Sequence, residues 1–258
     1  MIFVIQLGTI DYSTGLRLQQ RLIELRKEGK IGDTLLLLEH TPVITLGRNA
    51  KAANIIASRE ELSRRGVEVF ECDRGGDVTF HGLGQLVAYP IFDLRGMAST
   101  DGKRKTLGAI EYVRRLEEIL IRTCADFKIP TKRVAGLTGV WTSEGAEAKI
   151  AALGVHISRA VTSHGFALNV NTNLDYFNLI IPCGIAAKPV TSMQKELGRE
   201  LSLEDVAHSV SRHFGAVFQS QMLWLEGLDD LLRPSVGVPL RTPGELRELR
   251  GEDDTAWA

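Results

Sequence analysis

The 258-residue sequence lacks the features that mark membrane, secreted or nucleic-acid-binding proteins. It has no apolar run close to the roughly 20 residues that a membrane-spanning helix needs. Its formal net charge of −1 shows no excess of basic residues and so gives no support to nucleic-acid binding, which normally requires a basic surface. The first six residues are mostly apolar and follow no basic segment, so they predict a strand and not a signal peptide. These absences favour a soluble, cytoplasmic protein that binds neither membranes nor nucleic acid.

Cysteine is also scarce. The three cysteines are an odd number and none has the spacing of a metal site: Cys72, Cys124 and Cys183. This pattern argues for a reducing compartment over a disulfide framework. Cys124 falls on the apolar stripe of a helical segment, so we expect it in the core, and Cys72 is assigned no role. Since the histidines show no ligand spacing either, we expect no metal.

Hydrophobic periodicity predicts a few helices among many short strands. Helices are expected over 13–28 and 107–128, after the capping serine Ser58, and from Ser202 to about Gln219. Strands are expected over 2–7, 34–46 with a break at Pro42, 67–71, 85–94, 139–142, 149–158 and 163–170. This mixture predicts an α+β (α/β) fold, with the helices packed on a sheet. We expect one domain over 1–233, and a flexible tail over 234–258, where proline, glycine and charged residues are frequent.

The stretch from Arg74 to Gln85 is the densest cluster of glycines and polar side chains. Its twelve residues include four glycines, which leave backbone N–H groups accessible. Arg74, Thr79, His81 and Gln85 add hydrogen-bonding groups, so the loop could cradle a phosphate, a carboxylate or a carbonyl. It fits neither a P-loop nor a dinucleotide-binding turn. Taken alone, it could also be a glycine-rich hairpin with a surface histidine.

Cys183 lies between Pro182 and Gly184, in a bend rather than in a regular element. The proline restricts the backbone and the glycine lets a bulky ligand approach, as expected where a nucleophile is presented. Lys149 lies among small and apolar residues upstream. Together they suggest acyl transfer through a thiolate, if the fold brings them together. Alone, such a cysteine is more often buried and inert, and such a lysine is usually solvated.

Four short motifs follow one another along the chain. They are Arg74-Gly75-Gly76 with Thr79, His81, Gly82, Gly84 and Gln85; Lys149-Ile150-Ala151; Ser163-His164-Gly165; and Pro182-Cys183-Gly184. In this order and spacing, over about residues 30–220, they resemble the lipoyl(octanoyl) transferase family. Four motifs in register are far more specific than any one of them. The resemblance implies the biotin-protein-ligase-like fold that lipoate ligases share, with 1–233 as the catalytic domain.

The resemblance implies transfer of an octanoyl group from octanoyl-acyl carrier protein to a lysine of lipoyl domains. The implied acceptors are the lipoyl domains of 2-oxoacid dehydrogenase E2 subunits and glycine cleavage H protein. Cys183 would attack the donor thioester and hold the octanoyl group, and the acceptor lysine would then form the amide. Because a thioester is already activated, no ATP is needed. Lys149 would stabilise the thiolate when charged and accept a proton from the amine when neutral.

The resemblance also implies a substrate-binding set drawn from three segments. Its members are Arg74, Gly75, Gly76, Asp77, Val78, Thr79, Phe80, His81, Ala152, Leu153, Gly154, Gly165, Phe166 and Ala167. Gly154 and Gly165 are expected to make room for the acyl chain, and His81 to orient the thioester or a water. For His164 a purely structural role fits equally well.

The chain departs from the family pattern at two positions. Leu83 stands where the family usually has proline, and Ala152 where it commonly has a small polar residue. Both departures concern the pocket more than the Cys183–Lys149 pair. Two other functions remain open: an ATP-dependent lipoate–protein ligase on the same fold, and a non-catalytic protein that binds carrier domains. Neither needs a nucleophilic thiol, so an octanoyl adduct on Cys183 would separate the transferase from both.

Overall fold

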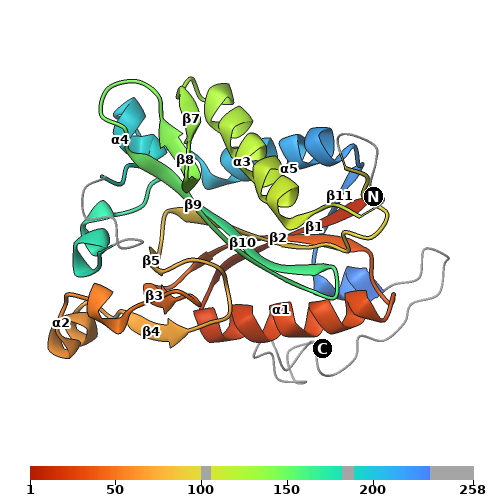
Figure 1. Cartoon of the computed structure of the whole chain (residues 1–258), viewed down its shortest axis with the longest axis horizontal. Coiled ribbons are helices and arrows are strands. Elements are labelled where there is room, and N and C mark those ends of the chain that lie inside the picture. The colour runs from red at the N-terminus through yellow and green to blue at the C-terminus, as the bar shows by residue number, and fades with distance from the viewer. Residues whose placement is uncertain (100–105, 182–188, 233–258) are drawn as a thin grey trace, which may run out of the picture.

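A computed structural model of the chain describes residues 1–99, 106–181 and 189–232, which form two sheets with helices packed around them (Figure 1). The large sheet has the strand order β11-β1-β2-β6-β10-β9-β8-β7, and the small sheet has the order β4-β3-β5. The large sheet consists of β1 (Ile2–Ile10), β2 (Asp33–His40), β6 (Gln85–Ile91), β7 (Thr131–Val134), β8 (Leu137–Thr142), β9 (Lys149–Ser158), β10 (Val161–Asn169) and β11 (Met222–Leu225). The small sheet consists of β3 (Val43–Leu46), β4 (Glu68–Glu71) and β5 (Val78–His81).

Strand direction is mixed, which agrees with the predicted α+β class. In the large sheet β1 pairs in parallel with β2 and β11, and the other pairs are antiparallel. The helices are α1 (Tyr12–Lys27), α2 (Arg59–Arg64), α3 (Ala109–Asp126), α4 (Met193–Leu197) and α5 (Leu203–Phe218). The described residues also include the 3-10 helices η1 (Ala52–Asn54), η2 (Leu174–Leu179) and η4 (Leu228–Leu232).

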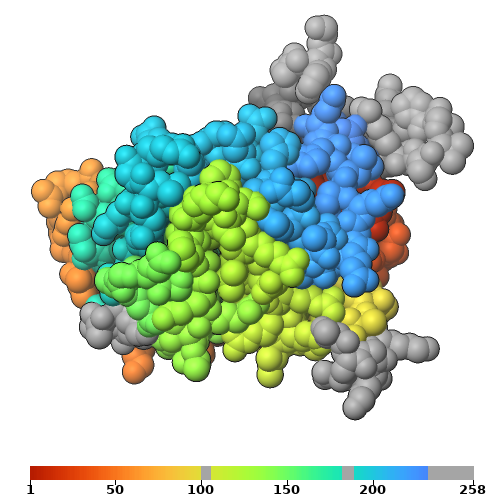
Figure 2. Space-filling model, turned by 90° about the horizontal axis from the view of Figure 1, so that it is seen from above, coloured from red at the N-terminus to blue at the C-terminus, as the bar shows by residue number. Residues whose placement is uncertain are grey.

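Helices cover both faces of the large sheet. In Figure 1, α3 and α5 lie on one face and α1 on the other, and Figure 2 shows α3 beside the α4–α5 region from above. Successive residues of a strand point to opposite faces, so β10 sends Phe166 and Leu168 into the core beneath α3 and α5. Ala167 points to the opposite face, into the core beneath α1. The small sheet has a separate core, which includes Leu62 of α2 and Leu179 of η2.

The predicted helices are confirmed, together with their capping residues. The Ser58 hydroxyl accepts a hydrogen bond from the Glu61 backbone N–H at 3.2 Å, and Ser202 caps α5 by the same contact with Asp205 at 3.1 Å. Cys124 lies in the core as expected, where burial raises the pKa of its thiol to about 12. The predicted tail over 234–258 lies outside the described residues. Within the part that the structure describes, no helix is long and apolar enough to cross a membrane.

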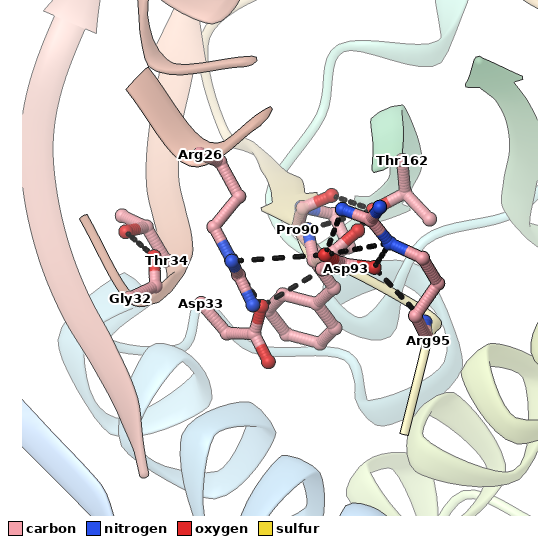
Figure 3. Close-up of polar contacts among 9 residues, drawn as sticks. Arg26, Gly32, Asp33, Thr34, Pro90, Asp93, Arg95 and Thr162 are labelled. Atoms are coloured by element: carbon pink, nitrogen blue, oxygen red, sulfur yellow. Dashed lines mark hydrogen bonds and ion pairs between the residues drawn. The ribbon is translucent and has the colours of Figure 1, made fainter. Parts of the chain in front are cut away.

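An ionic cluster ties together the end of α1, the start of β2 and the segment after β6 (Figure 3). The Arg26 Nε donates to Asp33 Oδ1 at 2.8 Å, and its Nη1 lies 3.8 Å from Asp93 Oδ2. Arg95 donates to the other side of Asp93, with Nη2 at 2.6 Å from Oδ2. The hydrogen bonds from Arg95, followed by the charges of Arg95 and Arg26, lower the pKa of Asp93. The Asp93 carboxylate therefore stabilises the fold when ionised.

The pH dependence of the free energy of unfolding tests whether the Asp93 carboxylate stabilises the fold through its charge. A carboxyl group whose pKa is lowered by folding adds stability at neutral pH, and that stability is lost as the pH falls through the folded-state pKa. We expect Asp93→Asn to lower the free energy of unfolding at pH 7 by about 1 kcal/mol. The loss should be much smaller at about pH 3, where protonation of Asp93 weakens the same interaction in the wild type. Chemical denaturation at both pH values measures this. Glu24→Gln, at an exposed pair, is the control, and an equal loss at both pH values would contradict the ionic interpretation.

Candidate active site

A cavity of about 330 Å³ opens on the α1 face of the large sheet, beside the small sheet. Its walls come from α1, the 74–77 turn, β5, β6, the start of β8, β9 and β10. The lining residues are Tyr12, Asn49, Arg74, Gly76, Asp77, Thr79, His81, Val87, Tyr89, Gly136, Leu137, Thr138, Lys149, Ala152, Leu153, Gly154, His164, Gly165, Phe166 and Ala167. Twelve of these belong to the predicted site, from three segments that are remote in the sequence.

Small side chains on three neighbouring strands make room for the cavity. Ala167 of β10 pairs with Ala152 of β9 on one side and with Val87 of β6 on the other. Two residues along, Gly165 pairs with Gly154 on the same face of the sheet. This face therefore forms a floor of two alanines, two glycines and one valine, which suits an apolar chain. Ala152, one of the two departures from the family pattern, is part of this floor.

The two floor glycines are required by backbone packing. A Cβ at Gly165 would lie 2.2 Å from the Ala88 carbonyl oxygen, and a Cβ at Gly154 would lie 2.6 Å from that of Gly75. The space that these glycines leave is thus partly taken by protein backbone. The prediction that they make room for the acyl chain is therefore refined: both border the cavity, and glycine there also lets neighbouring segments approach closely.

Arg74 holds the 74–77 turn against the small sheet. Its side chain is only 8% exposed, and its Nη2 donates to the Thr45 carbonyl at 2.7 Å and to the Asp77 carbonyl at 2.6 Å. Its Nε donates to the Thr45 hydroxyl at 3.1 Å, and the Gly75 N–H reaches across to the Val155 carbonyl of β9 at 3.1 Å. The turn therefore connects the two sheets and places a guanidinium in the cavity wall.

Strand β5 contributes only every second residue to the cavity. Thr79 and His81 line it, whereas Val78 and Phe80 belong to the core of the small sheet. Phe80 stacks on Tyr176 there, with 4.6 Å between ring centroids. Val78 and Phe80, which were predicted to bind substrate, therefore direct their side chains away from the cavity, because successive strand residues face opposite sides.

A directional chain of hydrogen bonds fixes the tautomer of His81. The Asn169 Nδ2 donates to the Thr191 carbonyl at 2.9 Å, so its Oδ1 must accept from Gln85 Nε2 at 2.8 Å. The Gln85 Oε1 then faces His81 Nδ1 at 2.8 Å, and this nitrogen must carry the proton. Burial, followed by the nearby His40 and Arg74, lowers the pKa of His81 to about 3. His81 is therefore neutral at physiological pH, with Nε2 as an acceptor.

Three aromatic side chains near the cavity were not predicted as site residues. The His40 Nδ1 donates to the Ile10 carbonyl at 3.0 Å, so its Nε2 accepts from the Tyr89 hydroxyl at 2.6 Å. Burial lowers the pKa of His40 to about 4, so this ring is neutral too. Tyr12 packs edge-on against His40, with ring centroids 5.2 Å apart. Tyr12 and Tyr89 lie in ordinary helix and strand patterns, and no motif distinguishes them in the sequence.

Lys149 begins β9, as predicted, and lines one end of the cavity. A second cavity of about 20 Å³ also has Lys149 in its lining, together with Asn169 and Val190. The Lys149 Nζ lies 4.8 Å from the centroid of the Trp141 ring, a cation–π contact. The Lys149 N–H donates to the Pro189 carbonyl at 2.9 Å, and the Lys149 carbonyl accepts from Thr191 N–H at 2.9 Å.

Cys183 lies outside the described residues, so its predicted role stays a prediction. The chain on both sides of it is described. The Ile181 N–H donates to the Asn54 carbonyl at 2.7 Å, and the Asn54 amide donates to the carboxylate of Asp77, a cavity residue, at 2.8 Å. On the other side, the Pro189 carbonyl accepts a hydrogen bond from the Lys149 N–H.

Leu83, the second departure from the family pattern, is 58% exposed and does not line the cavity.

Among the described residues, no cluster of three or more histidine, cysteine or acidic side chains could hold a metal ion. The polar side chains that line the cavity are instead those of Arg74, Lys149, Asp77 and Asn49, two histidines, two tyrosines and two threonines. An apolar floor with cationic groups in its walls can hold a chain with a reactive carbonyl at one end.

The fold is that of lipoate ligases. An archaeal bi-partite lipoate protein ligase from Thermoplasma acidophilum superposes with a TM-score of 0.66 at 16% identity, covering 87% of this chain and 85% of that one. Lipoate-protein ligase A bound with ATP superposes with a TM-score of 0.67 at 14% identity, covering 87% of each chain. At these identities the likeness shows the fold alone, and it confirms the predicted fold class.

Comparison of sequences identifies the protein family within this fold. Residues 11–215 match the family model of the lipoyl protein ligase A/B catalytic domain. The octanoyltransferase of Koribacter versatilis is 63% identical over 253 residues, which cover 98% of both chains. That of Acidobacterium capsulatum is 59% identical over 234 residues, covering 89% of this chain and 95% of the relative. The chain therefore belongs to the lipoyl protein ligase A/B catalytic-domain family, and within it to the octanoyltransferases, which are acyltransferases.

The Arg74 contacts predict a large loss of stability on substitution. Arg74→Met keeps the length of the side chain but leaves the Thr45 and Asp77 carbonyls without their buried donor. We expect the free energy of unfolding to fall by about 2–4 kcal/mol, measured by chemical denaturation. Arg17→Met, on the exposed face of α1, is the matched control and should change stability by less than about 0.5 kcal/mol. Equal effects of the two substitutions would contradict the role of Arg74.

Proposed function

We propose that this chain transfers an octanoyl group from octanoyl-acyl carrier protein to a lysine of a lipoyl domain, through a thioester on Cys183. One observation carries this proposal: Lys149 lines an apolar-floored cavity, and Pro189, the first described residue after Cys183, accepts a hydrogen bond from the Lys149 N–H. Membership of the octanoyltransferases supports the type of reaction.

Covalent geometry supports the pairing of Cys183 with this cavity. Cys183 is only two residues from Ile181, and two peptide units span at most about 7–8 Å between Cα atoms. The Ile181 N–H donates a hydrogen bond to the Asn54 carbonyl, and the Asn54 side-chain amide donates one to the carboxylate of the cavity residue Asp77. The described chain that leads to Cys183 is therefore connected to the cavity wall, which supports the proposed pairing of Cys183 with Lys149 although 34 residues separate them in the sequence.

In the first half-reaction the Cys183 thiolate attacks the carbonyl carbon of the donor thioester. A new C–S bond to Cys183 forms, the C–S bond to the carrier breaks, and the carrier leaves as a thiol after taking up a proton. A free thiol is only a few per cent thiolate at pH 7, so a nearby cation raises the reactive fraction. Lys149 supplies this charge at the cavity wall, where low dielectric strengthens the interaction.

In the second half-reaction the acceptor lysine, once deprotonated, attacks the Cys183 thioester. A C–N bond forms, the C–S bond to Cys183 breaks, and one amine proton passes through Lys149 to the departing thiolate. Because an amide is more stable than a thioester, this step pulls the sequence forward. The acceptors that we propose are lipoyl domains of 2-oxoacid dehydrogenase E2 subunits and glycine cleavage H protein.

An ATP-dependent ligase shares the fold but would follow a different course. It would adenylate a free acid, and a nucleophilic thiol would play no part in it. The likeness to an ATP-bound ligase lies at 14% identity and carries the fold only, whereas identity to octanoyltransferases reaches 63%. We therefore propose that the reaction proceeds without ATP or any other cofactor. We place it in the cytoplasm, where carrier proteins and lipoyl domains meet.

Loss of the covalent intermediate tests the role of Cys183. After mixing with octanoyl-acyl carrier protein, the wild-type protein should gain the mass of one octanoyl group, and a lipoyl domain should discharge it. Cys183→Ser should lower ATP-free transfer by about 10³-fold or more, since a serine hydroxyl is a much weaker nucleophile. Intact-mass spectrometry and transfer rates measure this. Cys72→Ser is the control, because Cys72 does not line the cavity; full transfer by the Cys183→Ser variant would refute the proposal.

Two substitutions separate the proposed roles of Lys149. Lys149→Ala should slow both half-reactions by about 10²–10⁴-fold, because it removes the cation and the proton acceptor. Lys149→Arg keeps the cation, but a guanidinium does not give up its proton, so the second half-reaction should suffer more than the first. Single-turnover rates of acylation and discharge measure this, with the exposed Lys132→Ala as control. Unchanged rates in Lys149→Ala would show that the assigned role is wrong.

A further inference from the structure

His164 reaches the cavity only because its backbone is left-handed. Its φ is +53°, a conformation that costs a residue with a side chain about 1–2 kcal/mol. In regular alternation it would face the same side as Phe166 and Leu168, which point into the core beneath α3 and α5. Instead, its side chain borders the cavity on the opposite side of the sheet. Strain of this kind persists where the surrounding structure holds it, and it often marks functional sites.

The surrounding structure holds this ring firmly. The His164 Nε2 donates to Asp73 Oδ1 at 2.7 Å, and its backbone N–H donates to Gln19 Oε1 at 2.7 Å. The hydrogen bond from His164 is the main cause that holds the pKa of Asp73 well below its usual range, so Asp73 is an ionised acceptor. The Tyr89 ring packs against the imidazole edge-to-face, with centroids 6.3 Å apart. His164 is only 3% exposed, which agrees with a fixed ring.

His164 and Lys149 lie at opposite ends of the cavity. His164 pairs with Val155, which is six residues beyond Lys149 on β9. At about 3.3 Å per residue, the two backbone positions are roughly 20 Å apart along the strand. The floor between them is made of Ala152, Ala167, Gly154 and Gly165, none of which projects far. The large side chains that line this part of the cavity are the rings of His164, Tyr89 and Tyr12 and the side chain of Arg74, which lies against Gly154.

We propose that the His164 ring, held by Asp73, is the end wall that sets the length of acyl chain that the cavity accepts. The inference rests on the proposed function, which places the acyl carbonyl at the Lys149 end. From that end the chain runs along the small-residue floor, and its last carbons meet the rings. A shorter chain leaves part of the cavity unfilled, and a longer chain meets a side chain that cannot move aside. Each misplaced methylene changes discrimination about 10-fold or more.

Tyr89 is less able to set the length, because its hydroxyl is bound to the buried His40 and its ring is part of the core beneath α1. Replacing it would disturb that core. His164 differs because glycine can adopt its left-handed backbone without strain, so the ring can be removed while the strand keeps its course. His164→Gly is therefore the informative variant.

The experiment compares acyl chains of 6, 8, 10 and 12 carbons on the carrier protein. For His164→Gly we expect octanoyl transfer to fall, because this chain no longer fills the cavity, and the kcat/KM ratio of decanoyl or dodecanoyl to octanoyl donors to rise by about 10-fold or more. Asp73→Ala, which removes the hydrogen-bond acceptor and so releases the ring without removing it, should shift the ratio in the same direction by a smaller factor. His156→Gly is the matched control: this residue hydrogen-bonds the same Asp73 but does not line the cavity, so the ratio should stay unchanged.

A second readout keeps the inference separate from the proposed function. Calorimetry with free octanoate, decanoate and dodecanoate measures the length of the cavity without any transfer step, and His164→Gly should gain affinity selectively for the longer acids. If wild type transfers no acyl group but this shift in binding occurs, the proposed function fails and the end wall stands. If a folded His164→Gly variant, checked by its unfolding midpoint, changes neither the kinetic ratio nor the binding order, the end wall is refuted.

Discussion

The site depends on one buried cation. The Arg74 guanidinium donates to three backbone carbonyls and a hydroxyl, and so holds the 74–77 turn against β3 of the small sheet. The turn also lies against Gly154, whose missing side chain allows the Gly75 carbonyl to approach β9. This contact sets the distance between the two sheets, and hence the width of the cavity between Thr79 and His81 on one side and the β9–β10 floor on the other. Because the carbonyl groups are buried, their loss of a donor is costly.

Burial removes the charge of two histidines at the cavity, whereas two basic side chains remain as its cationic groups. His81 and His40 lose their charge because desolvation lowers the pKa of each ring well below neutrality. Their hydrogen bonds to Gln85 and to the Ile10 carbonyl then fix their tautomers. Arg74 and Lys149 remain to supply positive charge, beside an apolar floor. This combination suits the chemistry that we propose, in which a chain without charge carries a thioester whose reaction passes through anionic sulfur and oxygen.

Much of the fold could be predicted from the sequence, because the signals are local. Apolar spacing identified α1 and α3, and the serine caps at Ser58 and Ser202 identified α2 and α5. Side-chain direction was harder to predict. Val78 and Phe80 belong to the same motif as Thr79 and His81 but point into another core. Tyr12 and Tyr89 reach the cavity from elements that carry no motif, since only the packing of α1 against β6 and β10 of the large sheet brings them there.

The sequence by itself determined the helices, most of the strands and the set of residue types that acyl transfer requires, because propensity, capping and motif spacing act over short stretches of chain. Only the tertiary structure decided which of those residues share a cavity. Pairing of β6, β10 and β9 aligned the small side chains into one floor. Hydrogen bonds to Pro189 and Thr191 joined the chain after Cys183 to Lys149. The left-handed turn at His164 reversed the direction of a side chain that simple alternation assigns to the opposite core, because Asp73 and Gln19 compensate its strain.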